Sequence, residues 1–267
     1  MHRRPRPSES PRYDGTTWPE TRVPALDLTT WLILAGTALL GSTVAGVTGF
    51  GTGVVLLPIL AWTLGIRAVV PVMTITMLIG NSARIWWSRD EIDAAAVKRF
   101  LLGAIPATAL GGVLYVGAST TSLGRIIGVF LLASVPLRRW LMSSSFKMRL
   151  EHFPILGAGI GFLSALVVTT GPMMTPFFLA YGLRRGGYIA TDAMCTLGMN
   201  LTRGVVLARY ALFTWETVAI GCMLGATMFV GAWIGRRLLE RMSERAFVTM
   251  IEVLLVVMGL HFVLVSR

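Results

Sequence analysis

The stretch Gly46-Val47-Thr48-Gly49-Phe50-Gly51-Thr52-Gly53 breaks a long hydrophobic run and is followed by Pro58. A later hydrophobic run contains a matching break, Leu166-Val167-Val168-Thr169-Thr170-Gly171-Pro172, which is followed by Pro176. Glycine and proline both disfavour a continuous helix. Irregular backbone inside a membrane must line a cavity or be buried in protein. The two breaks therefore predict two interrupted membrane helices.

The two breaks belong to an internal repeat. Glycine and proline landmarks recur 118 residues apart, and an Asn/Arg pair recurs 119 residues apart: Gly53 and Gly171, Pro58 and Pro176, Asn81 and Asn200, Arg84 and Arg203. This spacing is far longer than that of a solenoid repeat. We expect a disordered Pro- and Arg-rich tail over residues 1–28, a membrane repeat over 29–150 and a second repeat over 151–267.

The composition is that of a membrane protein. Of the 267 residues, 54% are hydrophobic and 14% are charged, and the mean hydropathy is +0.70. Soluble domains carry about 25% charged residues. A water-soluble core could not hide so much apolar surface, so lipid is the solvent that suits most of the chain.

Hydrophobic segments follow the tail in close succession, near residues 29–48, 51–65, 67–87, 98–117, 122–141, 153–170, 172–183, 188–213, 215–235 and 245–265. Two of them, 51–65 and 172–183, are short for a crossing of about 20 residues. We expect these to be tilted half-helices or re-entrant pieces. Five segments per repeat would turn the second half upside down. The expected fold class is all-α, a polytopic bundle of two inverted repeats of about five helices or half-helices each.

The formal net charge is +11, yet nucleic acid is not an expected partner, because no basic amphipathic face or aromatic–basic motif occurs. The basic residues fall mostly between hydrophobic segments, where they mark the cytoplasmic side. With ten crossings, this placement of the basic residues would put both termini outside the cell. The arginine-rich tail instead favours the cytosol, so the sequence does not decide on which side of the membrane the tail lies. The predicted location is the inner (plasma) membrane, with several crossings and the lipid bilayer as a partner.

The sequence carries no enzyme, metal or cofactor signature. Cys195 and Cys222 lie apart in hydrophobic runs, without metal-ligand spacing. The glycines from Gly49 to Gly53 lack the lysine that follows a phosphate-binding loop, and no nucleophile elbow occurs. We predict a protein that is not an enzyme and needs no cofactor or metal. Nothing in the sequence specifies an oligomeric state.

The repeated motifs resemble the TauE/SafE family of sulfite exporters. The first copy is Gly49-Phe50-Gly51-Thr52-Gly53 with Leu57-Pro58, and the second is Thr169-Thr170-Gly171-Pro172 with Thr175-Pro176. The stretch from Ala190 through Asn200-Leu201-Thr202-Arg203 is also similar to the second half of the family. The resemblance covers the chain from about Trp31 onward and implies export of sulfite or organosulfonates. Threonines stand at 52, 169 and 170, where the family often has glycines.

The breaks offer the first candidate substrate-binding residues. A half-helix that begins at a break presents free N–H groups with partial positive charge, which can hold an oxyanion. We expect such groups and neighbouring hydroxyls from both breaks to bind substrate: Thr48, Gly51, Thr52, Gly53, Thr169, Thr170 and Gly171. In the alternative interpretation, the glycines only allow helices to pack closely.

The recurring Asn/Arg pairs are the second set of candidates: Asn81, Arg84, Asn200 and Arg203. A charge within a membrane segment is costly and therefore indicates function. The guanidinium group has a fork of donors that suits an oxyanion. Arg84 precedes Trp86 and Trp87, so it could instead extend to the membrane interface. Asp192 is a proton-coupling candidate, or alternatively a residue that favours the start of a helix.

These observations predict a permease or exporter that moves a small anion, such as sulfite or an organosulfonate, by alternating access. The membrane potential or a proton gradient would drive it, because no ATP-binding motif occurs. The alternatives are a permease for another small solute, or a membrane assembly or sensor protein that does not transport. A polar cavity between the halves would favour transport, and a fully packed interior would favour the last alternative.

Overall fold

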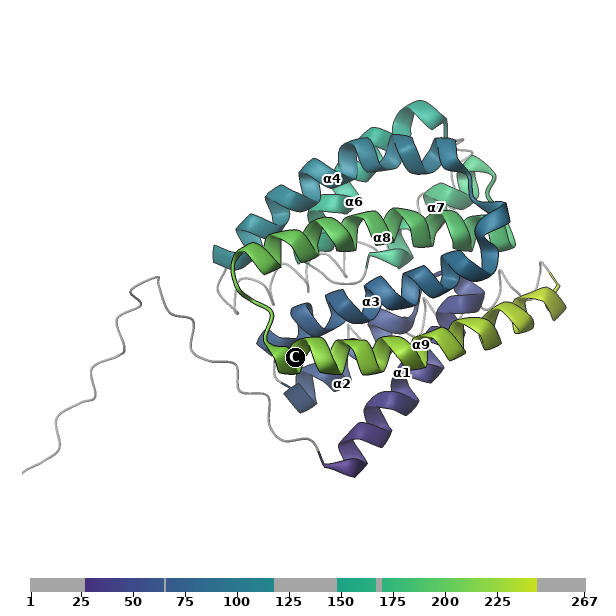
Figure 1. The fold of residues 1–267 in the computed structure, drawn as a ribbon. Coiled ribbons are helices and arrows are strands. Elements are labelled where there is room, and N and C mark those ends of the chain that lie inside the picture. Colours follow the sequence, from purple (N-terminus) through teal and green to yellow (C-terminus); the bar gives the residue numbers. More distant parts are fainter. Residues whose placement is uncertain (1–26, 65, 118–147, 167–169, 244–267) are drawn as a thin grey trace, which may run out of the picture.

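A computed structural model describes residues 27–64, 66–117, 148–166 and 170–243. Within these ranges the chain forms helices and no strands (Figure 1). The α-helices are α1 Leu28–Thr48, α2 Thr52–Leu64, α3 Ile66–Ser88, α4 Ala94–Gly117, α6 Phe153–Leu166, α7 Gly171–Tyr181, α8 Arg185–Arg209 and α9 Trp215–Arg241, with short 3-10 turns η1 Arg89–Glu91 and η2 Leu150–His152. The all-α class is confirmed. The tail up to residue 26 and the segments expected at 122–141 and 245–265 lie outside the described residues.

The helix ends follow from local chemistry. Asp27 precedes α1, and its carboxylate accepts a hydrogen bond of 3.1 Å from the N–H of Thr30. The hydrogen bonds from Thr30 lower the pKa of Asp27, which favours its ionised form at the start of the helix. Thr214 likewise caps the start of α9, where its side chain accepts a hydrogen bond from the N–H of Thr217 in a reciprocal capping box.

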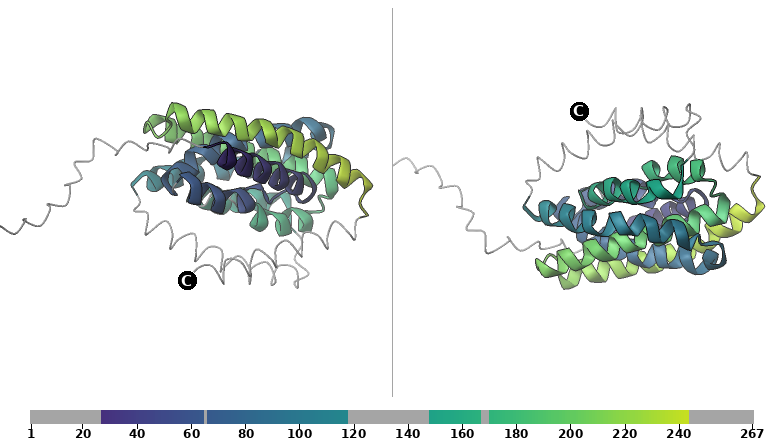
Figure 2. Two further views of the ribbon diagram at one scale, coloured as in Figure 1. Left: turned by 90° about the horizontal axis from the view of Figure 1, so that it is seen from below. Right: turned by 90° about the horizontal axis from the view of Figure 1, so that it is seen from above.

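The central helices are α3 and α8, which lie side by side in the middle of the bundle (Figure 1). Around them α1 packs against α9, α4 packs against α6, α3 also contacts α9, and α8 also contacts α4. The long helices run roughly along a common direction (Figure 2). The predicted repeat relates α1 to α6, α3 to α8 and α4 to α9. Under this correspondence the α1–α9 contact matches the α4–α6 contact, and the α3–α9 contact matches the α4–α8 contact. The predicted repeat would produce this pattern, and the inverted relation of its halves stays a prediction.

Small residues bring the outer pairs close together. On α1, a Cβ added at Gly46 would lie 3.0 Å from the Cα of Gly235 on α9. On α6, a Cβ added at Gly161 would lie 2.8 Å from the Cα of Ala104 on α4. Close approach of backbones at small residues is how membrane helices associate without a hydrophobic driving force between them. For these two glycines, which lie inside helices, helix packing is the role that the structure supports.

The core consists of two hydrophobic clusters. One gathers side chains of α2, α3 and α9 with the outer part of α1, including Leu56, Met73 and Leu224. The other gathers side chains of α4 and α6–α8, where Phe153 stacks on Phe178 with ring centroids 5.6 Å apart. The first cluster includes α9 from the second half, and the second cluster includes α4 from the first half, so each packed region combines helices of both halves.

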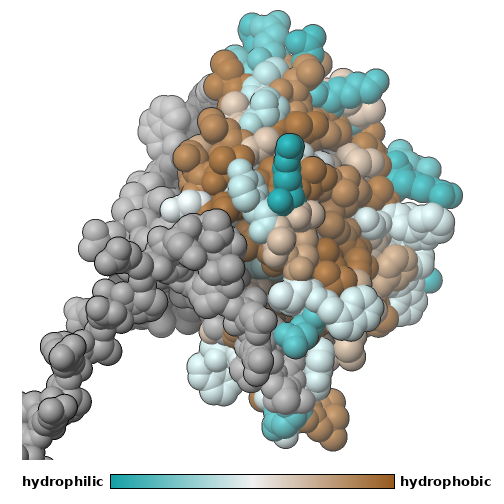
Figure 3. Space-filling model, turned by 60° about the vertical axis from the view of Figure 1, so that its left-hand side comes forward, coloured by the Kyte–Doolittle hydropathy of each residue, from teal (hydrophilic) through white to brown (hydrophobic). Residues whose placement is uncertain are grey.

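The outer surface is apolar in a way that suits lipid. Leu40, Leu102 and Val205 are 67%, 69% and 70% exposed, and hydrophobic side chains cover much of the described surface in Figure 3. Soluble monomers rarely expose large apolar patches. Within the described ranges, four helical stretches are long and apolar enough to cross a membrane: Leu28–Thr48, Ala68–Glu91, Ala94–Gly117 and Trp215–Arg241. The protein is an integral membrane protein.

Charged residues tie several helices together at one end of the bundle. Arg236 near the end of α9 pairs with Glu91 of η1 at 2.7 Å and with Glu240 at 3.0 Å. Arg185 at the start of α8 donates to the carbonyl oxygens of Leu239 and Met242. The ends of α3 and α9 and the start of α8 therefore meet, as expected for basic residues that were predicted to share one side of the membrane.

Candidate anion-binding site

The first break separates α1 from α2 at two glycines. Gly49 ends α1 with φ of 84° and donates from its N–H to the carbonyl oxygen of Ala45 at 2.8 Å. Gly51 follows with φ of 127°. Both conformations lie in the left-handed region that glycine adopts without strain. The chain can therefore leave one helix and begin the next at Thr52 within a few residues.

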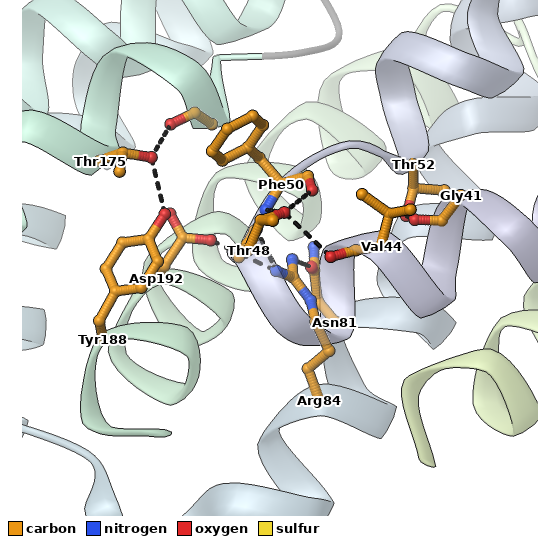
Figure 4. Close-up of polar contacts among 12 residues, drawn as sticks. Gly41, Val44, Thr48, Phe50, Thr52, Asn81, Arg84, Thr175, Tyr188 and Asp192 are labelled. Atoms are coloured by element: carbon orange, nitrogen blue, oxygen red, sulfur yellow. Dashed lines mark hydrogen bonds and ion pairs between the residues drawn. The ribbon is translucent and has the colours of Figure 1, made fainter. Parts of the chain in front are cut away.

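The second break lies beside the first one. A Cβ added at Gly171, the first residue of α7, would lie 2.5 Å from the Cβ of Phe50. A Cβ added at Gly49 would lie 2.6 Å from the hydroxyl of Tyr188. That hydroxyl is 2.7 Å from the Oγ1 of Thr175 on α7 (Figure 4). The two breaks thus meet inside the bundle, at the same place as α8.

A cavity of about 40 Å³ lies where the breaks meet. One water needs about 10–15 Å³ of such space, so the cavity has room for a few waters or one small ion. It is lined by both breaks, α3 and α8: Ala45, Gly49, Phe50, Gly51, Thr52, Gly53, Met77, Arg84, Ser164, Thr170, Gly171, Asp192, Thr196, Met199, Asn200 and Arg203.

Arg84 on α3 reaches the cavity from the first half. Its guanidinium donates to the carbonyl oxygen of Gly49 and to the Oδ1 of Asn81, which precedes it on the same helix face (Figure 4). Its Nη1 lies 3.5 Å from the Oδ2 of Asp192 on α8. Arg84 is buried, so it does not extend to the membrane interface as the alternative interpretation of the sequence supposed.

Arg203 on α8 reaches the cavity from the second half. Its guanidinium donates to the Oδ1 of Asn200, to the carbonyl oxygen of Ser164 at 2.7 Å and to the Oγ1 of Thr74 at 3.0 Å. Its exposed fraction is 2%. Among the residues that the structure describes, Arg203 has only uncharged partners. It is a buried cation, and a buried cation is costly unless a charge compensates it.

The two asparagines present spare donors next to these arginines. An arginine can only donate, so each asparagine must turn its Oδ1 toward the guanidinium and its NH₂ group away. The Nδ2 atoms of Asn81 and Asn200 are buried and have no hydrogen-bond partner among the described residues. Such unsatisfied donors are rare in folded proteins and call for a partner. Asn200 lines the cavity, so its NH₂ group is available to a ligand there.

Asp192 is the carboxylate of the cavity. It is 1% exposed, and its Oδ1 has no hydrogen-bond partner within the described part of the chain. It lies well inside α8, which begins at Arg185, so the alternative interpretation as a helix-start residue is wrong. The cavity therefore contains two guanidinium groups and one carboxylate, and carries an excess of positive charge.

The structure brings together most of the residues predicted from the sequence, and leaves two of the described ones outside the cavity wall. Thr48 donates to the carbonyl oxygens of Val44 and Phe50, so it stabilises the end of α1. Asn81 contacts Arg84 without lining the cavity. Thr169 lies outside the described residues. The others line the cavity: Gly51, Thr52, Gly53, Arg84, Thr170, Gly171, Asp192, Asn200 and Arg203.

Two threonines of the breaks differ in what they offer a ligand. The hydroxyl of Thr52 donates to the carbonyl oxygen of Gly41 at 3.1 Å, which joins α2 to α1. Thr170 lines the cavity and its side chain makes no capping bond to α7. Thr170 is therefore the better hydroxyl donor to a bound anion.

Sequence reasoning missed Ser164, Thr196 and Thr74. A signal for Thr196 was present, since Asp192, Thr196, Asn200 and Arg203 follow one another by four, four and three residues and so share one helix face. No comparable signal marked Ser164, whose backbone carbonyl rather than its side chain contacts Arg203.

A helical bundle with apolar spans, broken helices that meet and a polar cavity between its halves defines a class, the membrane transporters. The family model described as sulfite exporter TauE/SafE matches residues 33–262. The chain belongs to this family of membrane transporters, as its motifs predicted. A comparison with curated proteins found no match, and neither did a comparison with solved structures.

Proposed function

We propose that the protein moves a small oxyanion, such as sulfite, across the plasma membrane by alternating access. The observation that carries this proposal is Arg203, a buried cation in a cavity, with only neutral partners among the described residues. A bound anion would compensate its charge and would accept hydrogen bonds from the free NH₂ group of Asn200. Guanidinium groups match oxyanions in geometry as well as in charge.

The half-helices would complete the binding site. Both α2 and α7 begin at the cavity, at Thr52 and Gly171. The first N–H groups of a helix lack partners within it and carry partial positive charge. Two such ends, from different halves, would hold the oxygens of one anion between them.

The position of the cavity supports alternating access. It is lined by α1–α3 on one side and by α6–α8 on the other. Rocking of one half against the other would open such a site first to one side of the membrane and then to the other. The small volume of about 40 Å³ favours an ion of the size of sulfite over a larger organosulfonate.

Asp192 is the proposed proton carrier, because it is the carboxylate that lines the cavity. A proton on Asp192 would weaken its pairing with Arg84 and leave more positive charge for the anion. If so, a proton gradient should accelerate flux in the natural protein and have no such effect in the Asp192→Asn variant.

The cavity also argues against a membrane assembly or sensor protein that does not transport, because polar side chains would then be expected to be packed and paired. Here the NH₂ group of Asn200 and the Oδ1 of Asp192 lack partners among the described residues. A ligand that enters the cavity would supply them.

Flux into proteoliposomes tests the proposal directly. The purified protein should move sulfite faster than empty liposomes do, and should prefer sulfite to amino acids and to inorganic cations. Flux of amino acids in preference to every anion would indicate a different permease. A complete lack of anion flux in both directions, with the protein correctly inserted, would favour the assembly or sensor class.

A further inference from the structure

The charges of the cavity come from three side chains of its wall. Arg84 and Arg203 each contribute one positive charge, and Asp192 contributes one negative charge. All three are at least nine-tenths buried. With Asp192 ionised, one positive charge is left without compensation among the residues that the structure describes. A buried site of this kind is most stable when its ligand brings the total charge to zero.

The carboxylate of Asp192 in the second half has a counterpart in the first half, the hydroxyl of Thr74. Asp192 and Thr74 are 118 residues apart, one residue less than the 119-residue offset that relates the Asn/Arg pairs of the same two helices. Each contacts the arginine of the opposite half: Asp192 contacts Arg84, and Thr74 accepts a hydrogen bond from Arg203 at 3.0 Å. Replacement of a hydroxyl by a carboxylate at this one position is what reduces the positive charge of the cavity from two to one.

The free oxygen of Asp192 has a direct consequence for a bound anion. Its Oδ2 is next to Arg84, whereas Oδ1 has no hydrogen-bond partner among the described residues. An anion held by Arg203 in a cavity of about 40 Å³ lies close to this negative oxygen. Like charges placed together in a desolvated site repel each other strongly, and a second charge on the anion doubles the repulsion.

We propose that Asp192, in its ionised form, sets the charge selectivity of the site, so that it accepts oxyanions with one negative charge and rejects those with two. Sulfite would then bind as the singly charged hydrogensulfite ion, which coexists with the doubly charged ion near neutral pH. The inference rests on the proposed function, since it names the substrate class for the same cavity. Arg203 attracts the anion, and Asp192 determines how much negative charge the cavity tolerates.

Methanesulfonate and sulfate provide matched probes for this inference. Both are tetrahedral at sulfur and have five heavy atoms, but methanesulfonate carries one negative charge near neutral pH and sulfate carries two. The experiment measures how strongly each inhibits sulfite flux in proteoliposomes, at fixed pH and clamped potential. For the natural protein, methanesulfonate should inhibit at a concentration at least about tenfold lower than sulfate does.

Asp192→Asn removes the charge and keeps the shape of the side chain. The preference for methanesulfonate over sulfate should fall by at least about tenfold in this variant and can reverse. Asp90→Asn is the matched control, because Asp90 is exposed on η1, away from the cavity, and its loss should leave the preference unchanged. An unchanged preference in Asp192→Asn, with sulfite flux retained, would overturn the inference.

A second variant covers the case in which Asp192→Asn does not fold. Thr74→Asp places a carboxylate beside Arg203 and should weaken inhibition by methanesulfonate about tenfold or more. Retained inhibition in Thr74→Asp, or failure of both probes to inhibit the natural protein while sulfite is transported, would also refute charge selectivity. Absence of sulfite flux itself would instead refute the proposed function.

Discussion

The Arg84 cluster and the Arg203 cluster have the same local structure and different electrostatics. In each, an arginine donates to the asparagine three residues earlier on its helix and to a backbone carbonyl at or just before a break. In each, the arginine also reaches a side chain of the other half. That side chain is the carboxylate of Asp192 for Arg84 and the hydroxyl of Thr74 for Arg203.

Because of this difference in charge, the two equivalent arginines have different roles. Arg84 is paired with a charge, so it joins α3 to α8 and to the end of α1. Arg203 has no such pairing within the described residues and is left to attract a ligand. The hydroxyl of Thr74 donates to the carbonyl oxygen of Val70 at 2.7 Å, so its lone pair faces Arg203 and cannot neutralise it.

The largest effect is expected at the unpaired arginine. Arg203→Gln keeps a hydrogen-bond donor on a shorter side chain but removes the charge, and should reduce sulfite flux by about a hundredfold, in line with the loss of about 2–5 kcal/mol typical of a buried charge pair. Arg209→Gln is the control, since Arg209 lies exposed at the end of the same helix. Flux that survives in Arg203→Gln at the level of the control would remove Arg203 from the site.

Replacement of Arg84, the arginine paired with Asp192, should reduce the stability of the protein more than its binding of substrate. Arg84→Gln leaves the buried carboxylate of Asp192 without its cation, which should lower the stability of the folded protein by roughly 3–5 kcal/mol. Thermal unfolding in detergent measures the change. The double variant Arg84→Gln/Asp192→Asn should recover most of the loss, because no uncompensated charge remains. Equal stability of the single and double variants would show that the ion pair does not stabilise the protein.

The contact between the first break and α8 can be weakened at Gly49. Gly49→Ala introduces a Cβ at φ of 84° and against the hydroxyl of Tyr188, which should displace the first break from α8 and reduce flux about tenfold. Gly36→Ala is a matched control on the same helix, because a Cβ there meets no atom within 4 Å. If both variants transport equally well, the precise geometry of the first break is unimportant for transport.

The smallest effect is expected from a single hydroxyl. Thr170→Val preserves the shape of the side chain and removes its donor, so affinity for sulfite should fall about fivefold, the value of one ordinary hydrogen bond of about 1 kcal/mol. The control is Thr202→Val on α8, whose hydroxyl bonds to the carbonyl oxygen of Gly198. A loss in the control as large as in Thr170→Val would mean that the change acts through packing.

Much of the fold could be predicted because it depends on local patterns. Hydrophobic runs determined most helix ends to within about four residues where the structure describes them; α1 was expected at 29–48 and spans Leu28–Thr48, whereas the end of α9 was expected at 235 and lies at Arg241. The start of α8 was expected at 188 and lies at Arg185, since Gly186 and Gly187 give no helix signal. That error also made Asp192 look like a residue near a helix start.

The candidate site was predictable in part for a similar reason. Glycine, proline and buried arginine are conspicuous in hydrophobic segments, and their recurrence drew attention to both breaks and both arginines. The roles of Thr48 and Thr52 could not be predicted, because a hydroxyl can either bind a ligand or satisfy a nearby carbonyl. Only the positions of neighbouring backbone atoms decide between the two.

The sequence by itself determined that this chain lies in lipid, that its helices break at two related places, and that arginines occur within its membrane segments. These properties depend on composition and on spacing along the chain. The tertiary structure alone decided that the breaks meet, that Arg84 faces a carboxylate and that Arg203 faces none in the described part of the chain. Those relations join residues more than a hundred positions apart, such as Arg84 and Asp192, and packing of the two central helices brings them together.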